Sequence, residues 1–342
     1  MFHSEKCDFC GECLSRCYYL PFDAESGSRE FARLVAGEKV EWLHDCVTCM
    51  ACNEYCPQGA RPFDLILQRL EEDGHFVDQA LLQEMAERFD AKSEPRPVEA
   101  KGRVLSACVM TGNMPWAFQG QLFENLTILK GLPYFCNVLF VHMGNESIMR
   151  DRLQRAVNNL AQSGAKEIIF IHEDCYALFG GIAKEYGIEL PFRPVHIFEY
   201  LRDYLTEHKD RIKKLNMKVA YQRPCASRHT PPEVEKILDE IFDLIGVERV
   251  DRKYDRTAAL CCGVEVAGPG KKLFPRGKNF EPFRDMNIQD AREHGAEAMV
   301  YLCAMCFRTL NEKARAAGMK NYMITDICRL ALGEEMPPDK PE

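Results

Sequence analysis

The sequence predicts an α+β multidomain protein, in which a helical N-terminal domain precedes a duplicated α/β module. Three observations support this fold class. Eight cysteines fall in two closely spaced runs that end at Cys17 and Cys56, and apolar residues at helical spacing accompany them. From Val104 onward, β-rich runs alternate with amphipathic helices, which is typical of parallel sheets with crossover helices. Within that part, residues 163–176 align without a gap with residues 294–307, which indicates two homologous halves.

Composition narrows the class of protein. A chain of 342 residues is long enough for two or three domains with their own cores. Its net charge of -8 argues against nonspecific binding of nucleic acid. We expect no transmembrane segment, because no apolar run approaches the ~18 residues that a membrane span requires. The first residues lack the apolar core of a secretion signal, so we expect a cytoplasmic protein, either unattached or held at the inner face of the membrane by a partner.

The first two cysteine runs have the spacing of a two-cluster ferredoxin. Each run reads Cys-x2-Cys-x2-Cys-x3-Cys, and Pro57 follows the second run whereas Tyr18 follows the first. In bacterial two-cluster ferredoxins the fourth cysteine of each run ligates the other cluster. We therefore assign one [4Fe-4S] cluster to Cys7, Cys10, Cys13 and Cys56, and the other to Cys46, Cys49, Cys52 and Cys17. A disulfide framework is disfavoured, because disulfide-dense chains are usually small and secreted.

Helical apolar spacing surrounds these runs. The stripes are formed by Phe31, Leu34 and Val35, by Phe63, Ile66, Leu67 and Leu70, and by Leu82, Met85, Ala86 and Phe89. Gly74 is placed to end the second of these helices. Residues 1–91 are thus similar to the helical ferredoxin domains of fumarate reductase iron-sulfur subunits. Residues 92–103 are charged and contain prolines, so we expect a linker there.

The remainder is expected to form two α/β halves, residues 104–212 and 213–342. The expected strands are Val104–Val109, Val138–Val141, Ile168–His172, Val219–Tyr221 and Met299–Leu302, and the expected helices include Glu146–Ser163 and Phe283–His294.

The second half carries five cysteines from three separate segments. They are Cys225, the adjacent pair Cys261 and Cys262, and the Cys-x-x-Cys pair Cys303 and Cys306. In the internal alignment His172 corresponds to Cys303, and Cys175 to Cys306. Cys108 corresponds loosely to Cys225, and Cys136 lies near the position of the double cysteine. The first half has therefore lost the double cysteine, and function should concentrate in the second.

This order of motifs resembles the cysteine-rich "CCG" iron-sulfur subunits of the heterodisulfide reductase superfamily, in particular the fused subunit in which a ferredoxin part precedes the CCG part. The iron-sulfur subunits of glycolate oxidase and anaerobic glycerol-3-phosphate dehydrogenase are similar. The resemblance implies that the five cysteines hold a noncubane [4Fe-4S] cluster, of the kind that cleaves a disulfide by single-electron steps. Two features depart from the pattern: an insertion at Gly268–Phe280, and a first half without a complete five-cysteine site.

Both cysteine-rich halves leave alternatives open. In the second half, the five cysteines hold a noncubane cluster, hold zinc or an ordinary cubane with one thiolate to spare, or are inert thiols. In the first half, Cys108, Cys136, His172 and Cys175 make a Cys3His set that suits zinc or a cluster, or are a vestige packed as core.

The function expected from these features is that of an iron-sulfur electron-transfer subunit in a heterodisulfide reductase-like oxidoreductase complex. Electrons would pass through the two cubane clusters to or from the second-half cluster, which would reduce a disulfide or a quinone-like acceptor. No dinucleotide-binding fingerprint follows a predicted strand, so a two-electron cofactor belongs to a partner such as a flavoprotein, hydrogenase or dehydrogenase subunit. The alternative is a non-catalytic relay and assembly subunit whose second half holds zinc or a structural cluster.

Overall fold

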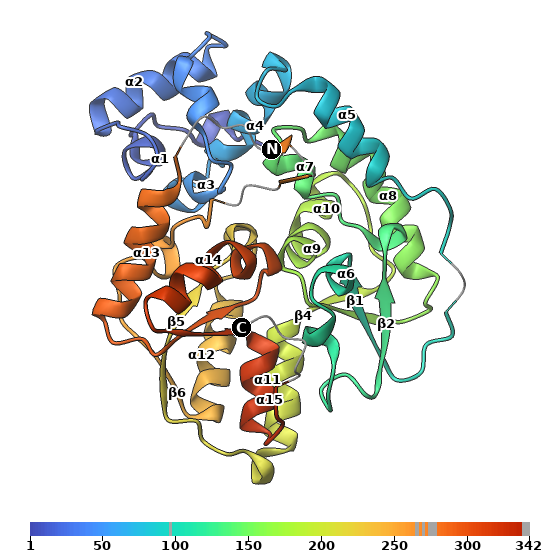
Figure 1. Cartoon of the computed structure of the whole chain (residues 1–342). Coiled ribbons are helices and arrows are strands. Elements are labelled where there is room, and N and C mark those ends of the chain that lie inside the picture. Colours follow the sequence, from blue (N-terminus) through green and yellow to red (C-terminus); the bar gives the residue numbers. More distant parts are fainter. Residues whose placement is uncertain (96–97, 264–266, 269–270, 273–278, 337–342) are drawn as a thin grey trace. The chain divides into compact units, whose positions relative to one another are not determined.

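The chain combines helices with two parallel sheets (Figure 1). The computed structural model describes residues 1–95, 98–263, 267–268, 271–272 and 279–336. Contacts group the chain into two units. Unit 1 comprises Met1–Asp90, Asn137–Leu153 and Glu265–Asn279, and unit 2 comprises Ala91–Cys136, Gln154–Val264 and Phe280–Glu342. The four-part division at residues 91, 103 and 212 stays a prediction.

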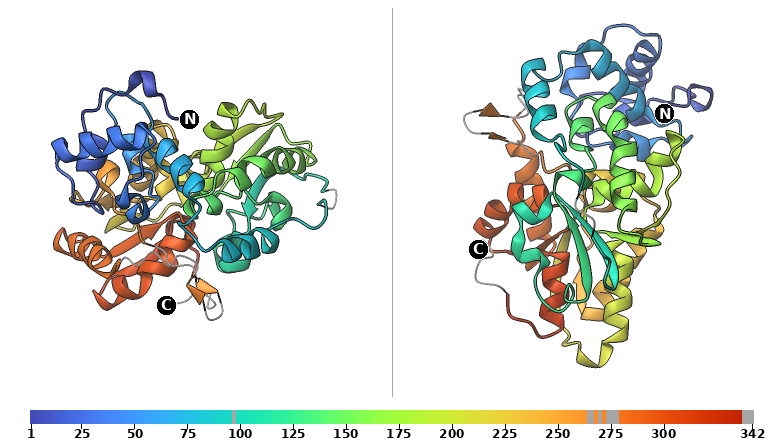
Figure 2. Two further views of the ribbon diagram at one scale, coloured as in Figure 1. Left: turned by 90° about the horizontal axis from the view of Figure 1, so that it is seen from above. Right: turned by 90° about the vertical axis from the view of Figure 1, so that its right-hand side faces the viewer.

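Unit 1 is mainly helical, and its N-terminal helices are drawn from blue to cyan in Figure 2. Its helices are α1 (Glu12–Ser15), α2 (Ala24–Val35), α3 (Ala51–Tyr55), α4 (Pro62–Asp73), α5 (Gln79–Arg88), α7 (Leu139–His142) and the start of α8 (Ser147–Ala161). The Asp23 side chain caps α2 by accepting a hydrogen bond from the Ser26 N–H, and Gly74 ends α4 in a left-handed conformation. The apolar stripes of α2, α4 and α5 are largely buried, so the three helices predicted from helical spacing are confirmed.

Unit 2 contains two four-stranded parallel sheets with the same connectivity. The first has the order β2-β1-β3-β4, and the second, read from its other edge, has the order β6-β5-β9-β10. In both sheets the second, first, third and fourth strands of the half therefore follow one another across the sheet. The strands are β1 (Arg103–Cys108), β2 (Leu126–Lys130), β3 (Glu167–Phe170), β4 (Arg193–His196), β5 (Met217–Gln222), β6 (Val247–Arg249), β9 (Ala298–Tyr301) and β10 (Lys320–Met323).

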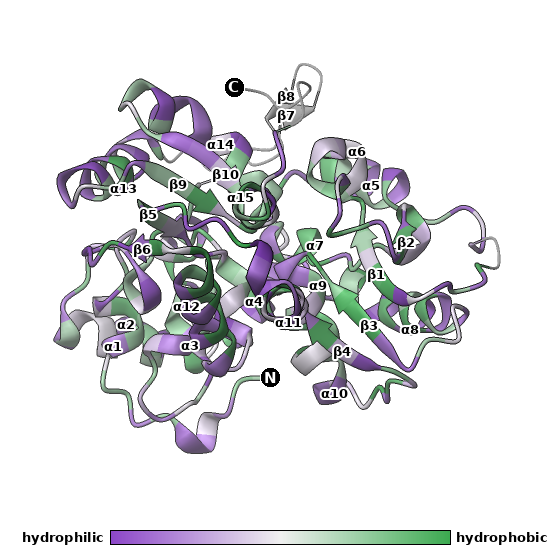
Figure 3. Cartoon of the chain, turned by 90° about the horizontal axis from the view of Figure 1, so that it is seen from below, coloured by the Kyte–Doolittle hydropathy of each residue, from purple (hydrophilic) through white to green (hydrophobic). Residues whose placement is uncertain are grey.

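Helices of unit 2 bury their apolar stripes on the sheets and on each other. They are α6 (Met110–Asn113), α9 (Glu173–Ala177), α10 (Ala183–Glu185), α11 (Ile197–Glu207), α12 (Glu233–Ile245), α13 (Glu281–Glu293), α14 (Ala304–Ala316) and α15 (Ile324–Ala331). In α12, Val234, Leu238, Ile241 and Ile245 lie on one buried face, and Gly246 ends the helix. Helix α11 packs against both α12 and α15, which joins the elements of the two halves into one core. The strands β3 and β9 are coloured as hydrophobic in Figure 3, as expected for strands covered on both faces.

Most of the expected strands are confirmed, but one is wrong. The strands predicted within Val104–Val109, Ile168–His172, Val219–Tyr221 and Met299–Leu302 correspond to β1, β3, β5 and β9, and the two predicted helices correspond to α8 and α13. The expected strand at Val138–Val141 is instead covered by helix α7, because a short apolar run has no periodicity that separates a buried strand from a buried helical turn.

Two short strands fall in the predicted insertion Gly268–Phe280 or directly before it. They are β7 (Ala267–Gly268) and β8 (Lys271–Lys272), and they pair antiparallel. Residues 269–270 and 273–278 of the insertion lie outside the described residues. Among the residues that the structure describes, no helix has the length and apolarity that crossing a bilayer demands.

Candidate metal centres

The cysteines of both halves of unit 2 follow the carboxyl ends of equivalent parallel strands. Cys108 is the last residue of β1, and Cys225 comes three residues after β5. His172 is the N-cap of α9, directly after β3, and Cys303 is the N-cap of α14, directly after β9. The carboxyl edge of a parallel sheet is where such folds usually bind ligands, so the same edge of each sheet is a candidate site.

In the second half, side-chain contacts link four of the five predicted thiols. Cys262 contacts Cys261 and Cys306, and Cys306 also contacts Cys303. Contact with Cys261 raises the pKa of Cys262 well above its usual value, whereas contact with Cys306 lowers the pKa of Cys303 well below it. Cys225 opens a 3-10 turn, Cys225–His229, and is half-buried. The structure therefore gathers the double cysteine and the Cys-x-x-Cys pair into one group.

A buried polar network fixes the backbone around the double cysteine. The Gln222 side chain donates to the Leu260 carbonyl at 2.9 Å, and the Asn287 amide donates to the Gln222 Oε1 atom at 2.6 Å. Arg284 donates to the carbonyls of Cys262 and Gly263 at 3.1 and 2.5 Å. Sequence reasoning missed these side chains, and only Gln222, two residues before the Pro224-Cys225 turn, carried a positional signal.

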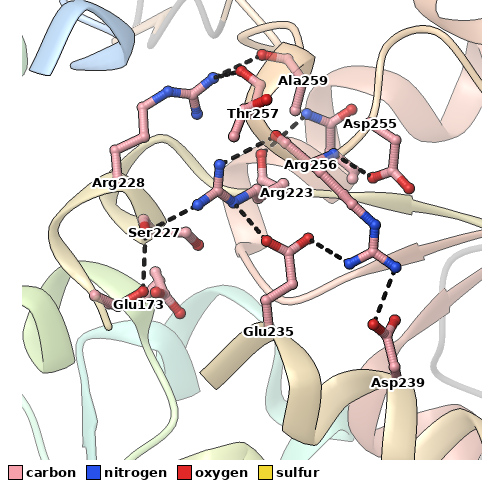
Figure 4. Close-up of polar contacts among 12 residues, drawn as sticks. Glu173, Arg223, Ser227, Arg228, Glu235, Asp239, Asp255, Arg256, Thr257 and Ala259 are labelled. Carbon is pink, nitrogen blue, oxygen red and sulfur yellow. Dashed lines mark hydrogen bonds and ion pairs between the residues drawn. The ribbon is translucent and has the colours of Figure 1, made fainter. Parts of the chain in front are cut away.

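An arginine network ties the Cys225 turn to the segment that leads into the double cysteine (Figure 4). Arg223 donates to the Ser227 carbonyl at 3.2 Å and to the Arg256 carbonyl at 3.0 Å. Arg228 donates to the Ala259 carbonyl at 2.9 Å. Charged donors make stronger hydrogen bonds than neutral ones, so these contacts hold two separate cysteine segments in a fixed relation.

In the first half, the predicted Cys3His set is assembled. The ligand atoms of Cys108, Cys136, His172 and Cys175 all lie within 4.8 Å of one another. The three cysteines are buried, and the His172 Nδ1 atom lies 3.8 Å from the Cys175 sulfur. Burial raises the pKa of the Cys108 thiol to about 12, whereas contact with Cys108 lowers the pKa of Cys136 well below its usual value.

His172 joins the two groups of side chains in unit 2. Its imidazole contacts Cys136 of the first half and Cys303 of the second. Burial alone would lower the pKa of His172, but the Asp174 carboxylate and the two thiol contacts raise it well above the ordinary value. The alignment placed His172 opposite Cys303, and the fold brings these two equivalent residues into contact.

In unit 1, the two ferredoxin-type loops share a backbone pattern. The residue before the second cysteine of each run, Phe9 or Thr48, has a positive φ, and so does the residue after it, Gly11 or Met50. Left-handed φ costs on the order of 1 kcal/mol for residues other than glycine, so it persists where the surroundings require it. The Thr48 N–H donates to the Cys46 sulfur at 3.4 Å, so the wrapped loop aims a backbone donor at a thiol.

The third cysteine of each run lies among cysteines of both runs. Burial raises the pKa of Cys13 to about 12, with further contributions from the nearby thiols of Cys56, Cys7 and Cys10. Burial also raises the pKa of Cys52 well above its usual value, and the nearby thiols are Cys46, Cys49, Cys13 and Cys17. The structure thus brings the fourth cysteine of each run near the other run. The cluster assignments themselves stay predictions.

Comparisons with known proteins agree with this cysteine-rich construction. The family model "Cysteine-rich domain", CCG, matches residues 219–311. A protein of Methanosarcina barkeri is 27% identical over 193 residues, which cover 54% of this chain and 44% of the relative, so this match spans less than half of the relative's length. A protein of Methanosarcina mazei is 22% identical over 97% of this chain and 94% of the relative. Both relatives are named as one and the same component of dihydromethanophenazine:CoB–CoM heterodisulfide reductase.

A solved structure shares the fold. The crystal structure of a hypothetical protein from Helicobacter pylori superimposes with a TM-score of 0.52 at 12% identity, over 83% of this chain and 60% of that one. Fold, cysteines and relatives together support an iron-sulfur redox subunit. More specifically, the chain carries a CCG cysteine-rich domain and resembles this component of heterodisulfide reductase, as the motif order predicted.

Proposed function

We propose that the chain is an iron-sulfur electron-transfer subunit of a heterodisulfide reductase-like oxidoreductase complex. The observation that carries this proposal is the linked set of thiols at Cys261, Cys262, Cys303 and Cys306, together with the Cys225 turn that the arginine network holds. A zinc ion or an ordinary cubane needs four thiolates. Five suit a noncubane [4Fe-4S] cluster in which one thiolate bridges two irons.

The ferredoxin-type loops fit two [4Fe-4S] cubanes with crossed ligation. Cys7, Cys10, Cys13 and Cys56 would hold one cluster, and Cys46, Cys49, Cys52 and Cys17 the other. The mutual influence of Cys13 and Cys52 supports two centres within Coulombic reach of each other. When bound, such clusters supply one-electron transfer over a wide range of reduction potentials.

The chain's own residues prepare these sites. Backbone N–H groups of Thr48, Ala60 and Gly263 donate to the sulfurs of Cys46, Cys56 and Cys261 at 3.4, 3.3 and 3.4 Å. Hydrogen bonds to ligand sulfurs stabilise thiolate charge and tune reduction potential, so each cysteine set has donors that favour the reduced state.

The proposed assembly is a complex with a partner that handles electron pairs. A flavoprotein, hydrogenase or dehydrogenase subunit would exchange electrons with the cubanes, because these clusters move electrons singly. The second-half cluster would act on a disulfide or a quinone-like acceptor. The relatives, which are named as a component of a heterodisulfide reductase, support membership in a multi-subunit enzyme.

Metal analysis and EPR of the anaerobically purified chain test the proposal. Three four-iron clusters predict about 12 irons per chain, and Cys261→Ser and Cys262→Ser should each lose about four irons together with one EPR signal. Cys328→Ser is the control, because Cys328 is buried in α15 and belongs to neither cysteine group. A wild-type chain with about eight irons, and zinc bound through Cys262, would instead indicate a relay and assembly subunit.

A further inference from the structure

We propose that Cys108, Cys136, His172 and Cys175 bind a single zinc ion, separate from the proposed iron-sulfur clusters. Their four ligand atoms lie within 4.8 Å of one another, although the residues come from three separate segments of unit 2. Across the described ranges, no other group of three or more His, Cys, Asp or Glu side chains is recorded at this spacing.

The spacing fits one ion better than a cluster. In a tetrahedral site with metal–sulfur bonds of about 2.3 Å and metal–nitrogen bonds of about 2.0 Å, neighbouring ligand atoms lie about 3.5–3.8 Å apart. The His172 Nδ1 and Cys175 sulfur atoms are 3.8 Å apart. A [4Fe-4S] cluster attaches each ligand to a different iron and so requires a wider set of donors.

The imidazole of His172 has the orientation of a metal ligand. One ring nitrogen, Nδ1, faces the Cys175 sulfur, and the other, Nε2, lies 3.5 Å from the Asp174 Oδ2 atom. Metal-binding histidines almost always direct the second nitrogen to a carboxylate, carbonyl or water, which fixes the ring and its tautomer. Asp174 is therefore a positioning residue for His172. A cysteine cluster kept only as packing would not require a carboxylate here.

The backbone at Cys108 is also specialised. Its φ is +52°, which is uncommon for a residue other than glycine, and the pairing of β1 with β2 shifts register between Ser106 and Cys108. The Gly131 N–H donates to the Cys108 carbonyl at 2.7 Å and holds this turn. Strained conformations concentrate at ligand and active sites, and this one brings the Cys108 thiol to the other three ligands.

The site is closed, as structural zinc sites are. Cys108, Cys136 and Cys175 are 0–1% exposed, and with His172 they supply all four tetrahedral positions. Because His172 also contacts Cys303, the ion would fix the imidazole beside the second-half cysteines. Zinc in the first half would thereby support the geometry of the proposed redox site without taking part in electron transfer.

Zinc analysis and zinc-edge X-ray absorption of the anaerobically purified full chain test the inference without any variant. The expected result is one zinc per chain with three sulfurs at about 2.3 Å and one nitrogen at about 2.0 Å. A chain that contains no zinc, or a zinc with a different ligand set, would overturn it.

Variants separate this site from the proposed redox site. Cys175→Ser should lower zinc content at least about tenfold with iron unchanged, and Asp174→Asn should weaken zinc affinity by about 10- to 100-fold. Cys262→Ser should lose iron and keep zinc, and Cys328→Ser should keep both. His172→Cys should retain zinc with four sulfur ligands, which decides the matter if Cys175→Ser does not fold. Loss of iron from Cys175→Ser with zinc unchanged would refute the assignment.

Discussion

A Cβ atom on Gly263 would lie 2.3 Å from the Cδ1 atom of the Phe280 ring. The Gly263 backbone has a φ of +63°, and Phe280 is only 2% exposed, so the ring has no solvent-filled space to move into. The residue after the double cysteine must therefore adopt a left-handed conformation and carry no side chain. This requirement explains why glycine follows Cys261 and Cys262.

Gly263→Ala should displace the double-cysteine loop. We expect loss of about four irons and of the EPR signal of the second-half cluster, with the two ferredoxin-type signals retained. Gly295→Ala is the matched control, because Gly295 has a φ of +82° but an added Cβ atom would meet nothing within 4 Å. Equal loss of iron from both variants would show that backbone strain alone, and not the contact with Phe280, is responsible.

Arg284→Met should loosen the same loop from outside. The substitution removes the hydrogen bonds to the carbonyls of Cys262 and Gly263, and a bond from a charged donor contributes about 1.5–3 kcal/mol. We expect iron of the second-half cluster to be lost to a chelator on the order of tenfold faster, followed anaerobically by absorbance. Arg292→Met, an exposed position on the same helix, should leave the rate unchanged. Equal rates for wild type and Arg284→Met would contradict this role.

Local spacing made much of this structure predictable. The apolar stripes of α2, α4 and α5 depend on residues three and four apart, and the sequence displays them directly. The alignment of His172 with Cys303 was also local, and both residues prove to be N-caps that follow corresponding strands. Residues that ligate metals are few in type, so their spacing announces candidate sites without knowledge of the fold.

Features that depend on tertiary contacts were not predictable. Strands β2, β4, β6 and β10 were missed because they are short and lie at or beside sheet edges, where alternation is weak. Gln222, Arg284 and Asn287 support the double cysteine only because the fold brings α13 beside β5. The contact of His172 with Cys303 likewise arises from the packing of two halves, which no repeat within the sequence specifies.

Crossed ligation in unit 1 gives a prediction for Cys56. Cys56→Ser should damage the cluster assigned to Cys7, Cys10 and Cys13, because the Cys56 thiol lies near Cys13 and Cys7. EPR of the reduced protein should then show one altered ferredoxin-type signal. Cys17→Ser is the reciprocal variant and should alter the other signal. Damage by Cys56→Ser that coincides with that of Cys52→Ser would contradict crossed ligation.

Arg249 is predicted to be a major source of stability in unit 2. Its guanidinium is 6% exposed, binds both carboxylate oxygens of Asp255 at 2.6 and 2.7 Å, and pairs with Glu235 at 2.7 Å. Removing one partner of a buried ion pair costs about 3–5 kcal/mol, because the remaining charges lose their compensation.

Arg249→Gln should therefore lower the midpoint of anaerobic thermal unfolding by on the order of 10 °C, measured by calorimetry. Arg193→Gln is the control. Arg193 also pairs with two carboxylates, those of Glu167 and Glu199, but it is 54% exposed, and such pairs contribute about 0–1 kcal/mol. Its midpoint should shift by no more than a few degrees. Similar shifts for the two variants would mean that the Arg249 network is hydrated in solution and contributes no more than a surface ion pair.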